Sequence, residues 1–587
     1  METIREAPFG QILRWMTGNR VLQYPEEHPD FVFPTTYLDE KQKVPVEEKL
    51  EEDKADEEKS SSPSPPEPHE GGIHDGIEAS RYDTRANTAP FSHERFEIEA
   101  ETAVERTLSR PIEPQRTKDG MILVDWYSTD DAANPQNWSL RKKTFAAVQI
   151  CLYTFVVYCG SAIYVPSEGQ IMEEFNVGDT KASLGLALYV VAYGIGPLLW
   201  SPLSEVPAFG RNVPYMISFF LFVILSIPTA LVKNLGGFLV LRFLQGFFGS
   251  PCLANGGASL QDLYSLIYVP IALTAWVSAA YCGPALGPLI SAFAVTAKGW
   301  RWALWEILWM SAPIFVVMFF FLPETSAENV LLRRAHRLRK VTGNSKIRSQ
   351  SEINRKGIKF GKVLLDALIK PLEIMVKDPA VLFTNIYTSL IYGIYYSFFE
   401  VFPLVYPPIY GFSLGLTGTT FICIIVACLL GVSLYVGYLL IYLIPDIMKN
   451  GLRAQEHRLV PALFAIFFPT IGLFIFAWTS RPSIHWIVSV IGIVIYAASG
   501  FVLFQCVFAY IPLSYPQYSA SLFAGNDFLR SSFAFGSILF SRPMYLNLGV
   551  AKGVSLLGGL SVLGIFGIFY LYFNGAKLRA RSKFAVS

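Results

Sequence analysis

Several ionisable side chains stand inside long apolar stretches of this sequence, among them Arg242, Glu400 and Asp527. A charge surrounded by hydrocarbon is expensive unless it is paired or hydrated, so such groups usually face an interior cavity. We therefore expect these three to line the inside of a helical bundle, where the two carboxylates can bind and release protons. Three simpler interpretations stay open: Arg242 reaches back to the nearer interface, Glu400 is merely interfacial, or Asp527 forms a structural ion pair with Arg530 three residues on.

A second pattern surrounds Glu400. Thr388, Tyr392, Tyr396 and Glu400 recur every four residues, which places them on one face of a helix, and two further aromatic residues flank them. Tyrosine offers a flat apolar surface with one hydroxyl, which suits varied amphipathic molecules. The stripe predicts a cavity lining; the alternative is that its rings pack against neighbouring helices. The candidate binding set is Tyr189, Tyr193, Gln245, Thr388, Tyr392, Tyr395, Tyr396, Phe399, Gln505 and Phe528.

Long apolar helices must position these residues. The chain has 587 residues, of which 52% are hydrophobic and 16% charged, a composition typical of a protein with many membrane spans. Runs of about 20 apolar residues, the length that crosses a bilayer as a helix, recur from residue 144 onward. The fold class is thus an all-α polytopic membrane protein, with spans at 144–164, 183–203, 214–232, 236–256, 271–295, 302–322, 381–402, 419–442, 459–478, 484–508, 521–541 and 554–573.

The spans divide the chain into five parts. Residues 1–143 form an N-terminal tail, mostly disordered because residues 39–118 are rich in Glu, Lys, Ser and Pro. Residues 144–322 and 381–573 form two six-helix halves, joined by the basic loop 323–380 and followed by the tail 574–587. The loop carries thirteen Lys and Arg residues, and the positive-inside rule therefore predicts that it and both termini are cytosolic.

Several short motifs carry a resemblance to a known family. The turn after the second span reads SPLSEVPAFGRNVPY (201–215), the fourth span contains RFLQG (242–246), and the fifth reads WVSAAYCGPALGPLI (276–290). LPETSAENVLLRRAHRLRKVTG (322–343) leaves the sixth span, and LIYGIYYSFFEVFP (390–403) lies in the seventh. Together they resemble the major facilitator superfamily, and within it the fungal twelve-span drug:proton antiporters linked to benomyl, cycloheximide and fluconazole resistance, from about residue 120 to the end.

The resemblance implies roles for these motifs. Arg242 corresponds to an arginine tied to proton movement, and Gly283, Pro284, Gly287 and Pro288 correspond to the antiporter motif of exporters, for which simple helix packing is the alternative. The glycines would form a small-residue face for close packing of another helix. Glu205, Gly210, Arg211 and Asp262 correspond to a cytosolic gate. There Glu205 and Arg211 would pair with charges or helix ends of the other half, with Asp262 a partner for Arg211.

The sequence therefore favours a proton-coupled multidrug exporter that works by alternating access. The resemblance implies that it lies in the plasma membrane, and the vacuolar membrane is the alternative. Its expected partners are drug-like small molecules, protons and the lipid bilayer, and it is expected to act as a monomer without nucleic acid. No phosphate-binding loop, nucleophile elbow or metal-ligand cluster is present, so we expect no enzyme activity, no cofactor beyond the proton gradient and no metal. The alternatives are an importer or facilitator of a small metabolite from the same superfamily, or a non-transporting membrane receptor or scaffold.

Overall fold

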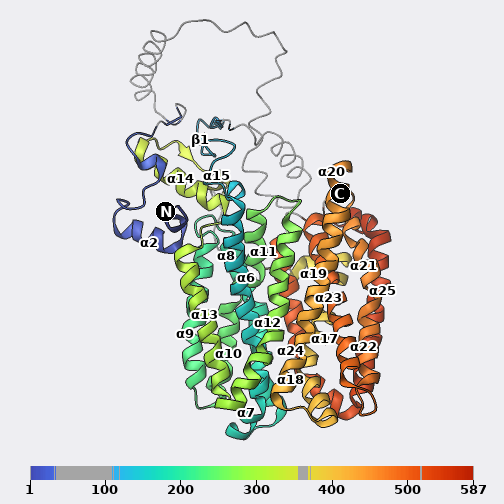
Figure 1. Cartoon of the computed structure of the whole chain (residues 1–587). Helices are drawn as coiled ribbons and strands as arrows, with labels where there is room; N and C mark the ends of the chain where they lie inside the picture. The colour runs from blue at the N-terminus through green and yellow to red at the C-terminus, as the bar shows by residue number, and fades with distance from the viewer. Residues whose placement is uncertain are drawn as a thin grey trace, which may run out of the picture.

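The structure is a computed structural model that describes most of the chain. The described residues are 2–31, 33–34, 37, 109, 111–117, 119–354, 368–369, 372–515, 519–582 and 584–585. The segment 39–118, for which the sequence predicts disorder, lies almost wholly outside them. The helices form two parallel bundles side by side, with both chain termini at the same end (Figure 1). We call this end the terminal end, and the other the opposite end.

The first bundle is built from the predicted N-terminal half. Its transmembrane helices are α6 (Leu140–Ala162), α8 (Asp179–Ser204), α9 (Asn212–Leu231), α10 (Leu235–Gly249) continued by α11 (Pro251–Leu263), α12 (Val269–Lys298) and α13 (Arg301–Phe321). The short η5 (Val165–Ser167) and α7 (Glu168–Phe175) join α6 to α8 at the opposite end. The boundary between α10 and α11 falls just before Pro251, because proline suits the first turn of a helix and not its interior.

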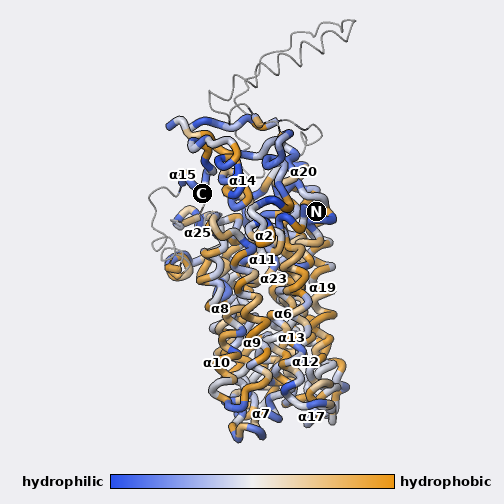
Figure 2. The backbone as a smooth tube through the Cα atoms, turned by 90° about the vertical axis from the view of Figure 1, so that its left-hand side faces the viewer, coloured by the Kyte–Doolittle hydropathy of each residue, from blue (hydrophilic) through white to orange (hydrophobic). Residues whose placement is uncertain are grey.

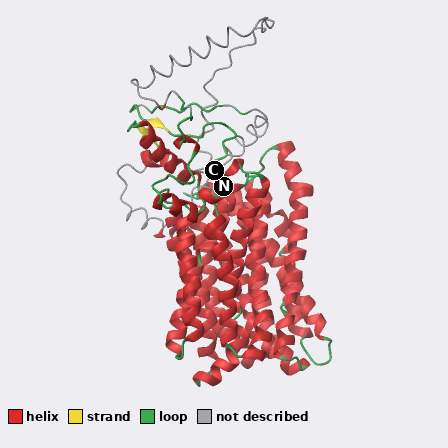
Figure 3. Ribbon diagram, turned by 60° about the vertical axis from the view of Figure 1, so that its left-hand side comes forward, coloured by secondary structure: helices red, strands yellow, loops and turns green. Residues whose placement is uncertain are grey.

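The second bundle repeats this plan. It contains α17 (Pro379–Tyr410), α18 (Leu414–Thr420) continued by α19 (Ile422–Tyr438), η6 (Leu439–Leu443) and α20 (Ile444–Asn450), then η7 (Gln455–Leu459), α21 (Val460–Ala465) and α22 (Phe467–Thr479), and finally α23 (Trp486–Ser514), α24 (Ser519–Leu548) and α25 (Val550–Arg581). Each predicted span falls on one of these segments, although most observed helices extend several residues further. Most of the described chain is helical, as the colouring by secondary structure shows (Figure 3).

Within the described part of the chain, eleven helical segments are long and apolar enough to cross a membrane. The segment left out by that criterion is α24, which carries Asn526, Asp527, Arg530 and Arg542 in its 30 residues. Its length and its position inside the bundle are nevertheless those of a span, and its polar groups face protein, as the side chains of Asn526, Asp527 and Arg530 are all buried. The low hydropathy of α24 is therefore a consequence of its place between the two halves.

The halves meet along two seams. Helix α8 packs along α24, and α12 packs against α18 and α19. On the first seam, a Cβ atom added to Gly194 would lie 2.3 Å from Cβ of Ser531, so only glycine permits this approach. On the second, a Cβ atom at Gly418 would lie 2.9 Å from the carbonyl oxygen of Pro288.

A polar layer covers the terminal end. It contains α1 (Glu2–Glu6), α2 (Pro8–Met16), η1 (Pro25–Glu27), α14 (Ala327–Thr342), α15 (Gln350–Asn354), and the parallel strands β1 (Ile122–Leu123) and β2 (Ile347–Arg348). Figure 2 shows this layer as a mainly hydrophilic region above an apolar bundle. The described ends of the predicted tail and the described part of the predicted basic loop thus fold against one another.

Ion pairs hold this layer together. Arg334 of α14 donates to Asp131 at 2.7 Å, and Arg337 donates to Glu26 at 2.8 Å. Burial by itself would raise the pKa of Asp131, but the Arg334 guanidinium outweighs it and holds that pKa below its ordinary value. Helix α14 begins where the Ser326 hydroxyl accepts the Asn329 N–H, and it ends at Gly343, whose φ of +71° is left-handed.

Candidate functional site

A network of phenols connects the two halves near the middle of the bundle. The Tyr193 hydroxyl on α8 bonds the Tyr396 hydroxyl on α17 at 2.8 Å and also bonds the Tyr392 hydroxyl. Ser161 of α6 bonds the Tyr396 hydroxyl at 3.2 Å. All of these side chains are buried. The structure therefore brings three of the predicted binding residues together and ties both halves to them.

An ion pair adjoins this network. Arg530 and Asp527 of α24 are hydrogen-bonded, as the structural alternative proposed, and both are buried. The same guanidinium lies over the Tyr392 ring, 4.5 Å from its centroid, and donates to the Tyr158 hydroxyl of α6 at 3.3 Å. Asp527 and Arg530 thus form a structural pair that is also part of the inter-half network, so the two interpretations are not exclusive.

The remaining residues of the α17 stripe face other neighbours. Thr388 accepts a hydrogen bond from Asn526 of α24 at 2.8 Å, and Asn526 also donates to Asn385 at 2.8 Å. The Tyr395 hydroxyl donates to the carbonyl of Tyr281 on α12 at 3.1 Å. Phe399 stacks on Phe421, with ring centroids 5.1 Å apart. The residues of α17 in this set thus contact α12 of the first half as well as α24 of their own half.

Arg242 is fully buried inside the N-terminal half. Its guanidinium donates to the carbonyl oxygens of Gly185 at 3.0 Å, Gly160 at 2.9 Å and Ser161 at 3.0 Å. Its charge lies 4.5 Å from the centroid of the Tyr189 ring. The side chain does not reach an interface, and it clamps α6 to α8 through Ser161, the same residue whose hydroxyl contacts Tyr396.

Two other predicted binding residues lie in the same interior. Tyr189 donates to the Val157 carbonyl at 2.7 Å, and Gln245 donates to the Ser226 hydroxyl at 2.8 Å. Both hydrogen bonds stay within the N-terminal half, and the bond of Gln245 joins α10 to α9. The Tyr189 ring also packs edge-on against the Tyr193 ring, with centroids 6.0 Å apart, so Tyr189 adjoins the inter-half network. Phe528 is half-buried on α24 and forms no aromatic pair within the described part of the chain.

Glu400 belongs to a charged cluster nearer the opposite end. Arg542 of α24 forms an ion pair with Asp179 at the start of α8, with 3.3 Å between nitrogen and oxygen, and this pair joins the two halves. Glu400 is 1% exposed and lies within electrostatic range of both groups. Glu168 of α7 is close enough to Glu400 for the two carboxylates to interact. The structure therefore places Glu400 inside the bundle, beside an inter-half ion pair.

The terminal gate motif lies at the junction of α8 and α9. Arg211 donates to Asp262 at 3.2 Å and to Ser204 at 2.9 Å. Glu324 accepts the N–H groups of Arg211 at 2.9 Å and of Asn212 at 3.1 Å, which caps the first turn of α9. Among the described residues, these partners of Arg211 belong to the N-terminal half or, for Glu324, to the start of the central loop, and the expected contact with the other half is not observed.

The other two gate residues shape this turn. Gly210 has a left-handed φ of +68°, and a Cβ atom there would lie 2.6 Å from Oε2 of Glu324. The Glu205 side chain is exposed at the end of α8. Gly210 is thus required by backbone geometry and by the cap, whereas Glu205 is available to the surface.

The antiporter motif packs in two directions. Cβ atoms added to Gly283 and Gly287 would lie 2.8 Å from the Phe155 carbonyl oxygen of α6 and 2.7 Å from the nitrogen of Ile163, the residue that caps the end of α6. The glycines therefore form a close seam within the N-terminal half, while the Pro288 carbonyl lies at the α18 contact described above. The prolines lie inside the continuous helix α12.

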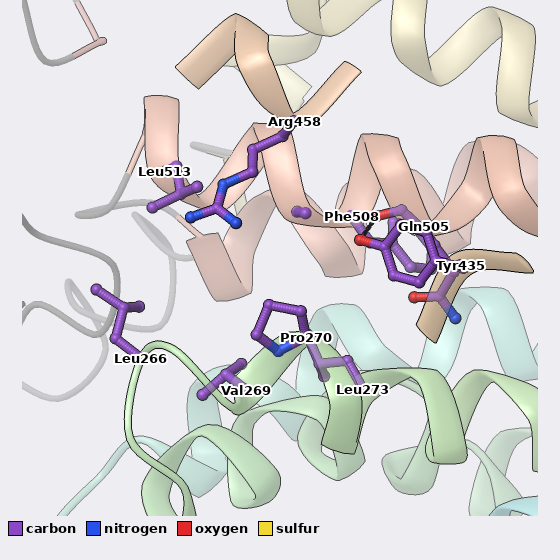
Figure 4. A pocket seen from close by; sticks show the side chains of 10 residues that line it. Leu266, Val269, Pro270, Leu273, Tyr435, Arg458, Gln505, Phe508 and Leu513 are labelled. Carbon is purple, nitrogen blue, oxygen red and sulfur yellow. Dashed lines mark hydrogen bonds between the residues drawn. The ribbon is translucent and has the colours of Figure 1, made fainter. Parts of the chain in front are cut away.

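Gln505 lies apart from the other candidates. It lines a pocket between α12 and the second half, near the terminal end, with Tyr435 beside it, and Arg458 and Pro270 line other parts of the same pocket (Figure 4). This pocket has a volume of about 20 Å³, enough for roughly one water molecule. Gln505 therefore does not contact the central network.

Several participating residues were not predicted from sequence. Ser161 and Tyr158 lie in an apolar run with nothing to distinguish them, and Asp179 and Arg542 are 363 positions apart in the chain. A usable signal existed for Asn385 and Asn526, since an amide in a span is costly unless it is bonded. The unpredicted set is Tyr158, Ser161, Asp179, Tyr281, Glu324, Asn385, Asn526 and Arg542.

A twelve-helix bundle of two similar halves with a buried inter-half polar network is the architecture of a secondary transporter. Residues 150–531 match the family described as Major Facilitator Superfamily. This match spans more than half of the sequence, and the chain belongs to the major facilitator superfamily.

Named relatives are fungal membrane proteins. The chain is 38% identical over 593 residues to the Cycloheximide resistance protein of Candida maltosa, covering 99% of each chain. It is 42% identical over 476 residues to Fluconazole resistance protein 1 of Saccharomyces cerevisiae, covering 80% of this chain and 86% of the relative. The predicted resemblance to fungal drug-resistance transporters is thus confirmed.

A solved structure supports the fold. The proton:xylose symporter XylE, from E. coli, aligns with a TM-score of 0.54 at 12% identity, covering 74% of this chain and 96% of that one. At this identity the likeness concerns the fold alone. The predicted twelve-helix major facilitator fold is confirmed.

Proposed function

We propose that this protein exports amphipathic drugs and toxic compounds in exchange for protons. The observation that carries this proposal is the buried network of Tyr193, Tyr392 and Tyr396 with Asp527 and Arg530, which links both halves at mid-depth. It combines aromatic surface, hydroxyl groups and one carboxylate. These are the features that a site for varied amphipathic molecules and for protons requires. The resistance named in the relatives above supports drugs as the substrate class.

Alternating access provides the mechanism. The halves rock about the central network, so that the contacts at one end of the bundle form while those at the other end separate. In the present state the opposite end is held by the ion pair of Asp179 with Arg542 and by the packing of α12 on α18. Substrate would enter from the terminal end and displace the phenol contacts between the halves.

Proton coupling is assigned to the carboxylates in the inter-half contacts. Asp527 is neutralised by Arg530 while the network is intact, and a substrate or a half rotation that draws Arg530 away leaves a buried carboxylate that favours a proton. Nearer the opposite end, the buried Glu400 lies within electrostatic range of Arg542, which is itself paired with Asp179. Arg542 and Arg530 therefore act as internal counter-ions that exchange with protons.

The energy supply is sufficient for useful export. Moving one charge across 100 mV is worth about 2.3 kcal/mol, which supports a gradient of roughly fiftyfold for each proton exchanged. We place the protein in the plasma membrane, acting as a monomer, with both termini and the polar layer in the cytosol. The thirteen cations of residues 323–380 support this orientation.

An accumulation assay tests the proposal. Cells that lack their own exporters, with and without this protein, are loaded with labelled cycloheximide, fluconazole and benomyl. The proposal predicts lower accumulation of at least one compound, restored to the control level by a protonophore. Unchanged accumulation across the panel would contradict export, and accumulation that rises with expression would favour an importer instead.

A further inference from the structure

Helix α2 is amphipathic with its apolar face turned outward. Ile12, Trp15 and Met16 are 46%, 81% and 71% exposed, whereas Arg14 between them is only 4% exposed. In a helix of a water-soluble layer the reverse arrangement is expected, with apolar groups buried and charges outside. The exposed apolar face therefore requires a partner other than water.

The inward, polar face of α2 is fully engaged with the protein. Arg14 donates to Glu27 at 2.7 Å, and its guanidinium lies 4.5 Å from the centroid of the Tyr24 ring. Gln11 donates to the Arg5 carbonyl at 2.7 Å and to the Tyr24 hydroxyl at 3.0 Å. These bonds fix the rotation of the helix, so the outward direction of Trp15 is determined and not incidental.

The position of α2 identifies what the apolar face meets. The Phe9 ring packs on Phe319 and Phe320, with centroids 6.1 Å and 4.6 Å apart, at the last turn of α13. Helix α2 therefore lies beside the terminal ends of α9 and α13, outside the bundle (Figure 1). The outward surface of these two helices is itself apolar, with Phe220 49% exposed and Val316 51% exposed, as a lipid-facing surface should be.

We propose that α2 is an interfacial helix whose Ile12, Trp15 and Met16 insert into the bilayer leaflet at the terminal end. The apolar face continues the lipid-facing surface of α9 and α13, so one leaflet covers both. Tryptophan suits the boundary between headgroups and acyl chains, and the exposed cation of Arg20, just past the helix, suits lipid phosphates. The occupant is the membrane surface, and the polar layer with α14 is thereby held against the bilayer through Arg14 and Tyr24.

Lipid-borne quenching tests this placement in the full-length protein. Trp15→Cys is labelled with a bimane maleimide, and the protein is reconstituted in phosphatidylcholine nanodiscs with or without bromines on the acyl chains. Asp30→Cys, at an exposed position of the same N-terminal segment, is the matched control. Wild-type protein treated identically measures labelling of the native cysteines. Substitution at Trp15 does not threaten folding, because its side chain is largely exposed.

The outcomes separate the possible partners of this face. The proposal predicts blue-shifted emission and strong quenching by brominated lipid at position 15, with little quenching by aqueous iodide. Position 30 should show the reverse. Strong iodide quenching at position 15 would show that the face is in water, and protection from both quenchers would show that protein covers it; either result overturns the proposal.

Discussion

The phenols of Tyr193 and Tyr396 share a hydrogen bond of 2.8 Å although they belong to different halves of the bundle. Because the two halves must separate during transport, the contacts that join them must each contribute only a small free energy. A neutral hydrogen bond contributes only about 1 kcal/mol net, so this contact can orient the halves without locking them. The network is therefore suited to break and re-form in every transport cycle.

Removing these hydroxyls should alter transport more than stability. Tyr193→Phe and Tyr396→Phe each delete one partner, and the double variant should cost less than the sum of the two, by a coupling of about 1 kcal/mol. Export kinetics and thermal unfolding of purified protein measure the two effects. Tyr545→Phe is the matched control, because its bond to Ser397 at 3.0 Å stays within the second half. Equal effects of Tyr193→Phe, Tyr396→Phe and Tyr545→Phe on export would show that the inter-half bond matters no more for transport than a bond within one half.

Arg242 should not tolerate lysine. The guanidinium donates to three carbonyls that point from different directions, and an ammonium group on a flexible chain cannot reproduce that fork. Arg242→Ala leaves these oxygens unpaired and should destabilise the protein by about 2 kcal/mol or more. We expect Arg242→Lys to fold but to lose most export, as measured by accumulation and by the amount of folded protein. Full export by the lysine variant would contradict the clamp.

The ion pair of Asp179 with Arg542 should control closure of the opposite end. Both side chains are partly exposed, so the pair adds at most about 1 kcal/mol to stability. Asp179→Arg places two cations together and should hold that end open, whereas the exchange variant Asp179→Arg with Arg542→Asp should recover part of the closure. Labelling of a cysteine introduced at Ser183 with an impermeant reagent reports on access. Equal labelling of the parent protein, Asp179→Arg and the exchange variant would show that the pair does not control closure of the opposite end.

Gly283→Val should reduce the amount of folded protein. The added Cβ atom would lie 2.8 Å from a backbone oxygen of α6, and backbone cannot move aside as a flexible side chain can. A role of this glycine in the antiporter motif alone predicts lost export with little loss of folded protein, whereas this geometry favours the helix-packing alternative. Size-exclusion profiles of the purified variant measure the outcome, with Gly437→Val as control, since a Cβ atom there meets nothing within 4 Å. A normal profile with lost export would restore the original expectation.

The sequence predicted the membrane helices well because their signal is local. The second span was expected at 183–203 and the helix covers 179–204, with the extra residues coming from polar ends that hydropathy does not detect. For Tyr392 and Tyr396, helical periodicity predicts only that the two side chains share one face of a helix, and it does not predict their contacts with the other half. Their partners Tyr193 and Ser161 lie more than 190 positions away, a distance at which one sequence carries no pairing information.

The polar layer was missed for a related reason. Composition correctly separates residues 39–118 from the apolar spans, but it does not reveal that Glu26 and Arg337 meet across 311 positions. The cap at Ser326 and the glycine at 343 are local signals that could have identified α14. The outward apolar face of α2 could not be interpreted without knowing where its polar face is held.

Proton movement in proteoliposomes is the most direct test of the central claim. Purified protein is reconstituted with a pH-sensitive dye inside, and uptake of a labelled drug is followed with and without an imposed pH gradient. We predict that the gradient drives drug accumulation, that drug addition moves protons in the opposite direction, and that Asp527→Asn retains drug exchange but loses both coupled movements. Drug accumulation that is independent of the gradient, or unaffected by Asp527→Asn, would contradict proton exchange through this network.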